Sequence, residues 1–283
     1  MKKTFLVVVM AVFCVMAEGQ IQTPAASPAG SVSSTIGLTD VKIEYFRPRM
    51  KGRKIFGEKD VLVPHGTLWR TGANSGTKIS FSDDVKVQNI EVPKGEYLIF
   101  TWPGATEWTV ALYKDVAIGG NTQGYDKAKE AANFKVNAEK LARKVETFTI
   151  SIDDIAADNK SGKVILAWEN TAVPFTISSD YDAKVMKSIE ANMKVNPNNY
   201  FSAATYYLET GKDLKKALEW MNIAVESNPN PPYWMLHQKA KIQKGLGDKK
   251  GAMETATASL NSAKQANNKD YQTLNEDLIK TLK

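Results

Sequence analysis

The sequence predicts an α+β protein, with an antiparallel β-sandwich or barrel-like domain followed by an all-α helical-repeat domain. Between residues 31 and 179, apolar residues recur at every second position and strand-forming residues dominate. From Asp180 onward the period changes to that of amphipathic helices. The first 30 residues show neither of these two periodicities. We therefore expect a signal peptide over 1–19, a flexible arm over 20–30, a β-sandwich domain over 31–179 and a helical domain over 180–283.

The N-terminus has the pattern of a secretory signal peptide. Lys2 and Lys3 precede an almost entirely apolar run, and Ala17-Glu18-Gly19 places small residues at the −3 and −1 positions of a cleavage site. Cleavage after Gly19 predicts a periplasmic or extracellular protein. A lipoprotein anchored through Cys14 is the alternative, although Phe13 stands where lipid-processing signals favour a small residue. No later run approaches the ~20 apolar residues of a membrane span, so the mature chain is expected to lack one.

Composition excludes several function classes. Cys14 is the only cysteine, so the mature chain would have no disulfide, thiol nucleophile or cysteine zinc site. The two histidines, His65 and His237, are far apart, and we expect no metal site and no cofactor. The formal charge of +6 is mild and spread along the chain, which disfavours nucleic-acid binding.

The β region contains several runs that alternate between apolar and polar residues. Turn sequences such as Pro93-Lys94-Gly95 and Pro103-Gly104 separate them. One helical stretch is expected near 125–132, and a flexible surface loop over 119–124. Strands are expected at 41–45, 78–82, 97–102, 108–113, 145–152, 164–168 and 174–177.

The helical region resembles tetratricopeptide repeats. The stretch from Asp213 to Asn228 has an apolar helical stripe, and Ala217 and Ala252 are 35 residues apart, close to the ~34-residue period of that repeat. Ser259 stands where the repeat prefers alanine, and Lys264 where it prefers proline. Flanking helices are expected over 182–193 and 269–282. An irregular helical bundle is the alternative.

The segment Trp69-Arg70-Thr71-Gly72-Ala73-Asn74 combines residue types that a solvated loop does not need. We expect Trp69 to pack in the core, Gly72 to permit a tight bend and Asn74 to cap it. Arg70 is the functional question, because a buried guanidinium requires an acidic partner. Glu169, which also follows a tryptophan, is the predicted partner, either in a structural ion pair or in a shared ligand site.

Other polar residues suggest binding or acid–base chemistry. Arg47 and Arg53 belong to a basic run and could grip a carboxylate or phosphate, or could brace the loop that carries them. His65 has a near-neutral intrinsic pKa and could act with Glu169 as an acid–base pair, or be an incidental turn residue. The ligand-binding candidates are therefore Arg47, Arg53, Arg70, Asn74 and Glu169, and the alternative catalytic candidates are His65 and Glu169.

Several of these segments together resemble domain-of-unknown-function family 2911, a group of exported bacterial proteins. The resemblance covers roughly residues 28–177, and the W-R-T-G-A-N string is its most specific element. It implies a fold unit and an envelope setting, but no activity and no catalytic residues. The segments that carry it are Arg47 to Gly57, Val63 to Gly66, Trp69 to Asn74, Gly95 to Phe100, Glu107 to Val110 and Ala167 to Asn170.

We hypothesise a non-enzymatic binding or assembly module of the cell envelope. The helical domain would bind a protein or peptide, and the β domain a small anionic or glycan ligand. The rival is an envelope hydrolase or isomerase acting on a glycan or small anion, which requires His65, Arg70 and Glu169 to meet in one pocket. A purely structural sandwich is the third possibility. The partner-binding candidates are Tyr207, Trp220, Tyr233 and Trp234.

Overall fold

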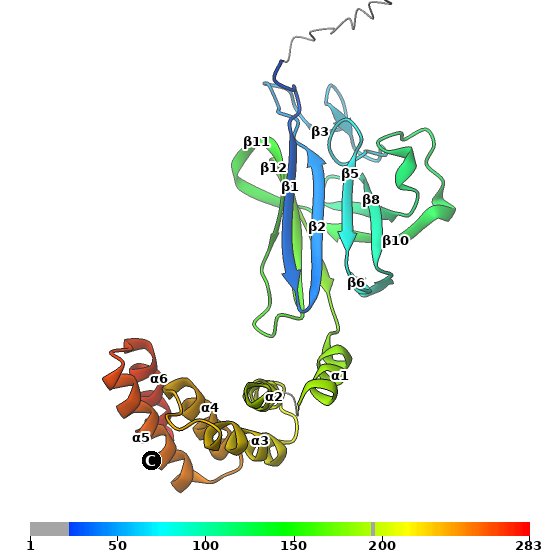
Figure 1. Cartoon of the computed structure of the whole chain (residues 1–283). Helices are drawn as coiled ribbons and strands as arrows, with labels where there is room; N and C mark the ends of the chain where they lie inside the picture. Colours follow the sequence, from blue (N-terminus) through cyan, green and yellow to red (C-terminus); the bar gives the residue numbers. More distant parts are fainter. Residues whose placement is uncertain (1–22, 194–195) are drawn as a thin grey trace, which may run out of the picture. The chain divides into compact units, whose positions relative to one another are not determined.

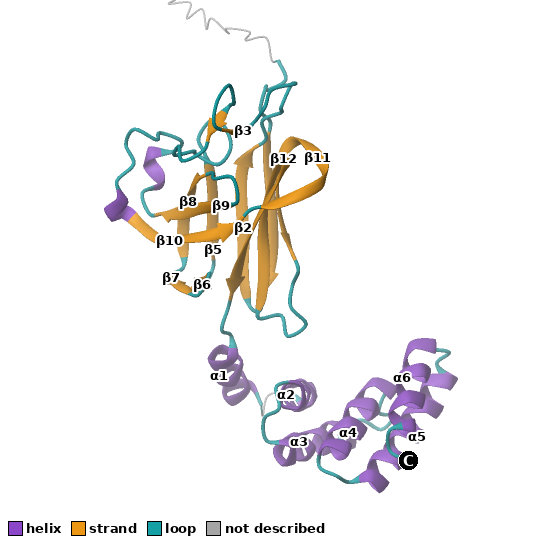
Figure 2. Cartoon of the chain, turned by 180° about the vertical axis from the view of Figure 1, so that it is seen from behind, coloured by secondary structure: helices purple, strands orange, loops and turns teal. Residues whose placement is uncertain are grey.

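The computed structural model describes residues 23–193 and 196–283, and Figure 1 traces the chain through them. The chain divides into two compact units, the first ending at Asp180 and the second beginning at Tyr181. Antiparallel sheets build the first unit and helices the second, which confirms the predicted α+β class (Figure 2). The expected signal peptide, with Cys14, and residues 20–22 of the expected arm lie outside the described residues.

The larger sheet of the first unit has six strands in the order β1–β2–β5–β8–β9–β10, and all neighbours are antiparallel. Every strand expected over 41–45, 78–82, 97–102 and 108–113 lies in it. The strands are β1 (Ala29–Ile36), β2 (Thr39–Phe46), β5 (Thr77–Phe81), β8 (Gly95–Trp102), β9 (Glu107–Tyr113) and β10 (Glu130–Asn137).

The smaller sheet has the order β11–β12–β6–β7. Its strands are β11 (Glu139–Asp153), β12 (Ser161–Ser178), β6 (Val85–Val87) and β7 (Ile90–Val92). The two strands expected at 164–168 and 174–177 form one continuous β12, because Glu169 and Ala172 also pair with β11 across a register shift. A short parallel pair, β3 (Phe56–Gly57) and β4 (Val63–Pro64), lies outside both sheets.

The inner faces of the two sheets share one hydrophobic core, so the first unit is a β-sandwich. Strand β2 shows how the sequence builds it: Val41, Ile43 and Tyr45 are buried, and Lys42 between them is exposed. The same cluster contains residues of the smaller sheet, including Phe148 and Phe175. Burial of one face of each sheet therefore dictates the alternation seen in the sequence.

Two expectations about local structure were wrong. The helical stretch expected near 125–132 is reduced to a 3-10 turn, η2 (Lys127–Lys129), and β10 begins directly after it. Pairing with β9 prevails there over the helix propensity of the Lys- and Ala-rich sequence, since it buries Phe134 and Val136 in the core. In addition, β1 begins at Ala29, so the last two residues of the expected arm belong to the sheet.

The second unit contains α1 (Asp182–Asn192), α2 (Pro197–Glu209), α3 (Leu214–Glu226), α4 (Tyr233–Gly245), α5 (Lys249–Gln265) and α6 (Lys269–Lys280). Side chains of Asn196, Asp213, Asp248 and Asn268 cap the starts of α2, α3, α5 and α6 by accepting backbone N–H hydrogen bonds. Within the described ranges, no helix has both the length and the apolar character needed to cross a membrane.

The helices pack mainly in sequential pairs. The closest pairs are α2 with α3 and α4 with α5, while α6 packs on α5. Helix α4 also contacts α2 and α6. Ala217, Ala240, Ala252 and Ala256 are completely buried between helices, where their small side chains allow close approach of the backbones.

Candidate functional site

Trp69, the first residue of the motif, lies in the sandwich core as expected. Its ring stacks on Trp168 at a centroid distance of 5.8 Å and an interplanar angle of 19°. Trp108, Phe148 and Phe56 surround this pair in edge-on arrangements. The tryptophan is therefore part of a five-ring aromatic cluster and is not available to a ligand.

The backbone of the motif is fastened to β8. Trp69 and Thr101 exchange two backbone hydrogen bonds, at 2.8 and 2.9 Å. The hydroxyl groups of Thr71 and Thr101 lie 3.0 Å apart, and both residues are completely buried. The Thr77 hydroxyl donates to the Thr71 carbonyl. Thr71 has a φ of 55°, unusual for a β-branched residue, and these hydrogen bonds hold it there.

The motif bends at Gly72 and Asn74 as expected, but the Asn74 side chain does not cap the bend. Gly72 has a φ of 140°, and a Cβ there would lie 3.2 Å from the Phe46 carbonyl oxygen. Asn74 adopts a φ of 54°, and its backbone carbonyl, rather than its exposed side chain, accepts a hydrogen bond from Arg70 Nη1 at 3.0 Å. The motif thus closes a turn on itself.

Arg70 packs against Gly120, which sequence reasoning had assigned to a flexible loop. Gly120 is buried, and a Cβ there would lie 2.8 Å from Arg70 Cδ and 2.4 Å from the Asn74 carbonyl oxygen. This segment therefore fits closely over the motif turn. A glycine surrounded by glycine and polar residues carries no sequence signal for such packing.

Glu169 does not pair with Arg70. Its Oε2 accepts hydrogen bonds from the backbone N–H groups of Ile55 and Phe56, at 3.2 and 3.5 Å. Both side chains of the expected pair are described, and their polar contacts go to different partners. Glu169 therefore anchors the end of the basic loop to β12. It has a φ of 55° and lies at the register shift of the pairing between β11 and β12.

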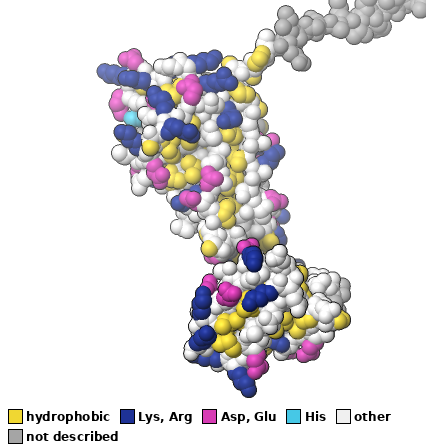
Figure 3. All heavy atoms as spheres, turned by 90° about the vertical axis from the view of Figure 1, so that its left-hand side faces the viewer, with side chains coloured by type: hydrophobic (Ala, Val, Ile, Leu, Met, Phe, Trp, Pro, Cys, Tyr) yellow, Lys and Arg dark blue, Asp and Glu magenta, His cyan; other side chains and the backbone are white. Residues whose placement is uncertain are grey.

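The two arginine candidates brace the fold. Arg47 Nη2 donates to the Thr149 hydroxyl at 3.3 Å, and its Nε to the Phe148 carbonyl at 3.4 Å. Arg53 donates from Nε and Nη2 to the carbonyls of Met50 and Arg49, which closes the loop on itself. On the face shown in Figure 3, basic side chains are interspersed with acidic ones rather than gathered around one site.

His65 lies beside the short strand β4 and contacts Glu58, with 2.9 Å between Nδ1 and Oε1. The Glu58 side chain is 83% exposed, so the pair lies at the surface. His65, Arg70 and Glu169 thus each have separate partners. A cavity of 560 Å³ next to the motif is lined by Ser75, Gly76 and Gly119 among others, but by none of these three residues.

Residues 27–177, more than half of the chain, match the family model described as a protein of unknown function, DUF2911. The chain belongs to this family. The match covers the β-sandwich almost completely and ends within β12. Because the family is one of unknown function, membership identifies the domain and assigns it no activity.

A Bordetella parapertussis protein known from its solution structure is similar to this chain at 17% identity. The similarity covers 37% of this chain and 89% of that protein, with a TM-score of 0.32. No curated protein matches the chain significantly.

The DUF2911 domain has a second polar and aromatic site, which sequence reasoning missed. On the outer face of the larger sheet, Tyr125 stacks on Tyr113 at 4.8 Å and contacts the rings of Phe100 and Trp102 edge-on. Its hydroxyl donates to Glu130 at 2.7 Å. Burial, followed by this hydrogen bond, raises the pKa of Tyr125, so the phenol remains a donor. Next to it lies a cavity of 550 Å³.

The partner-binding candidates of the helical unit differ in exposure. Tyr207 and Trp220 contact each other edge-on at 4.8 Å in the core. Tyr233 packs on Tyr271 between α4 and α6. Only Trp234 of the four has a largely accessible ring, at 41% exposure.

Proposed function

We propose that this protein is an exported, non-enzymatic binding module whose helical unit holds a peptide segment of a partner. The observation that carries the proposal is a row of side chains on α4, formed by Trp234, Gln238 and Lys241. The spacing i, i+4 and i+7 puts them along one side of the helix. The export part rests on the N-terminal sequence, and predicts a mature chain that begins at Gln20.

The arrangement of the helices supports a tetratricopeptide-like scaffold. Two sequential helix pairs, α2 with α3 and α4 with α5, follow one another, and the first helices of successive pairs are in contact. Ala217 and Ala252 occupy equivalent places in α3 and α5, and both are completely buried. Such repeats present the first helix of each pair to a ligand, and α4 is one of these helices.

Each side chain of the α4 row has a property suited to peptide binding. The Trp234 ring offers a large apolar surface, and Tyr233 fixes it edge-on at 4.9 Å. Gln238 Oε1 is buried and makes no hydrogen bond within the described residues. A rotation of this side chain toward the α4 row would let the oxygen accept a backbone N–H of a bound peptide. Lys241 adds a positive charge. The segment 181–283 has 15 lysines against 11 acidic residues, which favours an acidic partner.

The polar residues of the family motif support a non-enzymatic role. Arg47, Arg53, Arg70 and Glu169 all bond to backbone or side-chain groups of their own domain. This arrangement favours the structural reading of the motif over an acid–base site. We therefore assign no catalytic residue.

Site-specific photocrosslinking tests the peptide-binding role. A photoreactive phenylalanine analogue would replace Trp234, and in a matched control Leu274, an exposed residue of α6. Crosslinking in intact cells should give a specific adduct from position 234 but not from position 274. The variant Lys241→Glu, which reverses the charge at the end of the α4 row, should weaken binding of the partner identified in the adduct. Equal adducts from both positions, or from neither, would reject α4 as the binding surface.

A further inference from the structure

A second candidate site lies on the outer face of β8, β9 and β10, within the first unit. In this part of the sheet Trp102 pairs with Thr109, and Ala111 pairs with Asn133. Their neighbours Thr101, Val110 and Phe134 face the core, so these four side chains face outward. Thr109 is smaller than Trp102 and Asn133, and these three side chains line a hollow over β9, whereas Ala111 is completely buried.

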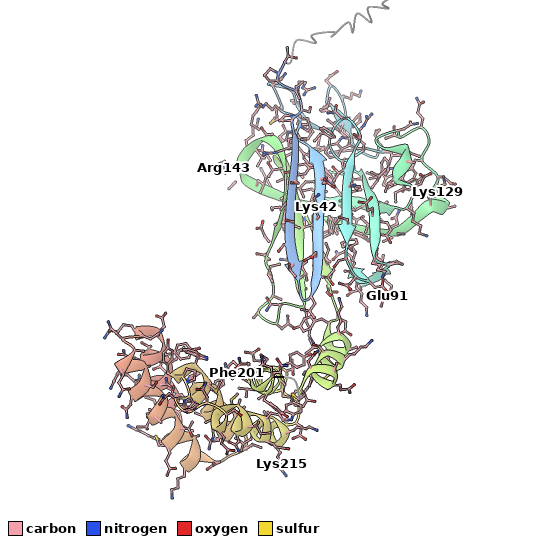
Figure 4. The ribbon with its side chains drawn as sticks, in the orientation of Figure 1. Lys42, Glu91, Lys129, Arg143, Phe201 and Lys215 are labelled. Atoms are coloured by element: carbon pink, nitrogen blue, oxygen red, sulfur yellow. The ribbon has the colours of Figure 1, made fainter. Side chains whose placement is uncertain are left out.

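This hollow is the cavity of 550 Å³, lined by Gly66, Trp102, Thr109, Tyr125, Glu130 and Asn133, with Lys127 at its rim. Its volume lies within the range of about 300–1,000 Å³ that is usual for small-molecule sites. Figure 4 labels Lys129 at this corner, where η2 leads into β10.

The aromatic wall of the cavity is held rigidly. Tyr125 contacts Trp102 edge-on at 5.4 Å and Phe100 at 5.0 Å. The loop that carries Tyr125 is tied to its own start by an ion pair between Lys129 Nζ and Asp115 Oδ2 at 2.7 Å. A ring fixed by packing loses little conformational entropy when a ligand binds on it.

The polar side chains of the cavity are also held in place by hydrogen bonds before a ligand binds. Glu130 Oε1 accepts from the Tyr125 hydroxyl at 2.7 Å, and Oε2 accepts from Asn133 Nδ2 at 2.9 Å. These two bonds fix the carboxylate but leave further lone pairs on each oxygen. Within the described part of the chain, Asn133 Oδ1 and the Trp102 indole N–H make no hydrogen bond, so an acceptor and a donor remain for a ligand.

We propose that this cavity binds a neutral sugar ring of an oligosaccharide. A pyranose has a C–H face that packs on aromatic rings and a rim of hydroxyl groups, each of which both donates and accepts. In the cavity, the rings of Trp102 and Tyr125 would contact the C–H face. The hydroxyl groups would form hydrogen bonds with the polar side chains of Glu130, Asn133 and Thr109. Glu130 and Lys127 are the two charged residues that line the cavity, and their opposite charges leave it without net charge, which favours a neutral ligand over an anion.

Saturation-transfer NMR on the purified full-length protein tests the proposal. The probes are the tetrasaccharides of β-1,4-linked N-acetylglucosamine, β-1,4-linked glucose and α-1,4-linked glucose. Glucose and N-acetylglucosamine monomers distinguish a polymer ligand from a free sugar, and an extended tetrapeptide tests peptide binding at the β10 edge. Ring C–H protons of at least one tetrasaccharide should receive saturation, with a larger effect than the corresponding monomer.

Three variants test the location. Trp102→Ala should weaken tetrasaccharide binding by about tenfold or more, since an aromatic surface is lost. Thr109→Trp fills the hollow and leaves Trp102, Tyr125, Glu130 and Asn133 in place, so it should abolish binding even if Trp102→Ala folds poorly. Leu274→Ala, at an exposed residue of α6 that belongs to neither proposed site, is the control and should bind normally. The proposal is overturned if no saccharide binds, if the peptide alone binds, or if folded Thr109→Trp retains full affinity.

Discussion

Glu169 accepts a hydrogen bond from the backbone N–H of Ile55 at 3.2 Å, and this contact joins β12 to the end of the basic loop. Ile55 is completely buried, and its loop leads directly into Phe56 of the aromatic cluster. The carboxylate thus fixes the loop whose last residues pack in the core. Its role is to position the loop, and Arg70 is stabilised separately by the Asn74 carbonyl.

Glu169→Ala is expected to destabilise the DUF2911 domain by about 1–3 kcal/mol, because it removes the acceptor of the Ile55 N–H. Glu169→Gln retains an acceptor oxygen and should cost less. Urea denaturation followed by tryptophan fluorescence measures both.

The same experiment tests the separation of Glu169 from Arg70. The free energies of unfolding of Arg70→Ala and Glu169→Ala should add in the double variant to within about 0.5 kcal/mol, as expected for residues without shared contacts. A coupling energy well above that value would show that the two side chains interact after all.

Gly120→Ala should destabilise the domain by about 1–3 kcal/mol, the usual cost of overpacking. The new Cβ would lie 2.4 Å from the Asn74 carbonyl oxygen, which is backbone and cannot move aside cheaply. For the same reason Arg70→Ala should not rescue it. Gly124→Ala is the matched control, because its Cβ would meet only the side chain of Asn121, whose nearest atom, Nδ2, lies 3.4 Å away. Equal melting temperatures for the two variants would contradict the close fit over the motif.

The sequence predicted those parts of the fold that depend on periodicity. Strand β2 and helix α3 each bury one regular face, and this face is visible in the order of the residues. The prediction from periodicity failed at the start of β10, where a helix was expected up to residue 132. The pairing with β9 that forms this strand is a tertiary contact, and the local helix propensity opposes it. Strand β1 was missed for a similar reason: its burial alternates only weakly, and its partner β2 defines it.

The candidate site was harder to predict, because hydrogen-bond partners depend on topology. Trp69 and Gly72 were identified from residue type alone. The predicted Arg70–Glu169 pair was wrong, since the sequence does not reveal that β12 changes register at Glu169. The cavity beside Trp102 was missed because Tyr125 and Glu130, which line it, lie in the stretch 125–132 that was expected to be a helix.

A double-mutant cycle on Thr71 and Thr101 should show strong coupling. Thr71→Val leaves the buried Thr101 hydroxyl without its partner at 3.0 Å, and should cost about 1–3 kcal/mol. Thr101→Val does the same to Thr71, although the Trp69 carbonyl at 3.4 Å remains as a weak acceptor. The double variant removes both hydroxyl groups and keeps the shape, so it should be clearly more stable than the sum of the single changes predicts. Simple additivity in denaturation experiments would exclude a shared hydrogen bond.

The contact between α4 and α6 should weaken on acidification. His237 is buried, and Nδ1 lies 2.9 Å from Asn275 Oδ1. Because Asn275 Nδ2 donates to the Tyr271 carbonyl, Oδ1 is the atom that faces the ring, so His237 Nδ1 carries the proton and Nε2 titrates.

Burial lowers the pKa of His237, assisted by the positive charge of Lys241 and opposed by the Asn275 hydrogen bond. The unfolded chain therefore binds a proton more readily than the folded one, and stability must fall as the pH drops below about 6.5 toward the lower folded pKa. Hydrogen exchange of α4 and α6 amides at pH 7.5 and 5.5 measures this in a His65→Gln background, which removes the second histidine. His237→Gln should abolish most of the difference between the two pH values. If protection in α4 and α6 falls equally in both proteins, another group is responsible and the buried neutral imidazole is not the source of the acid sensitivity.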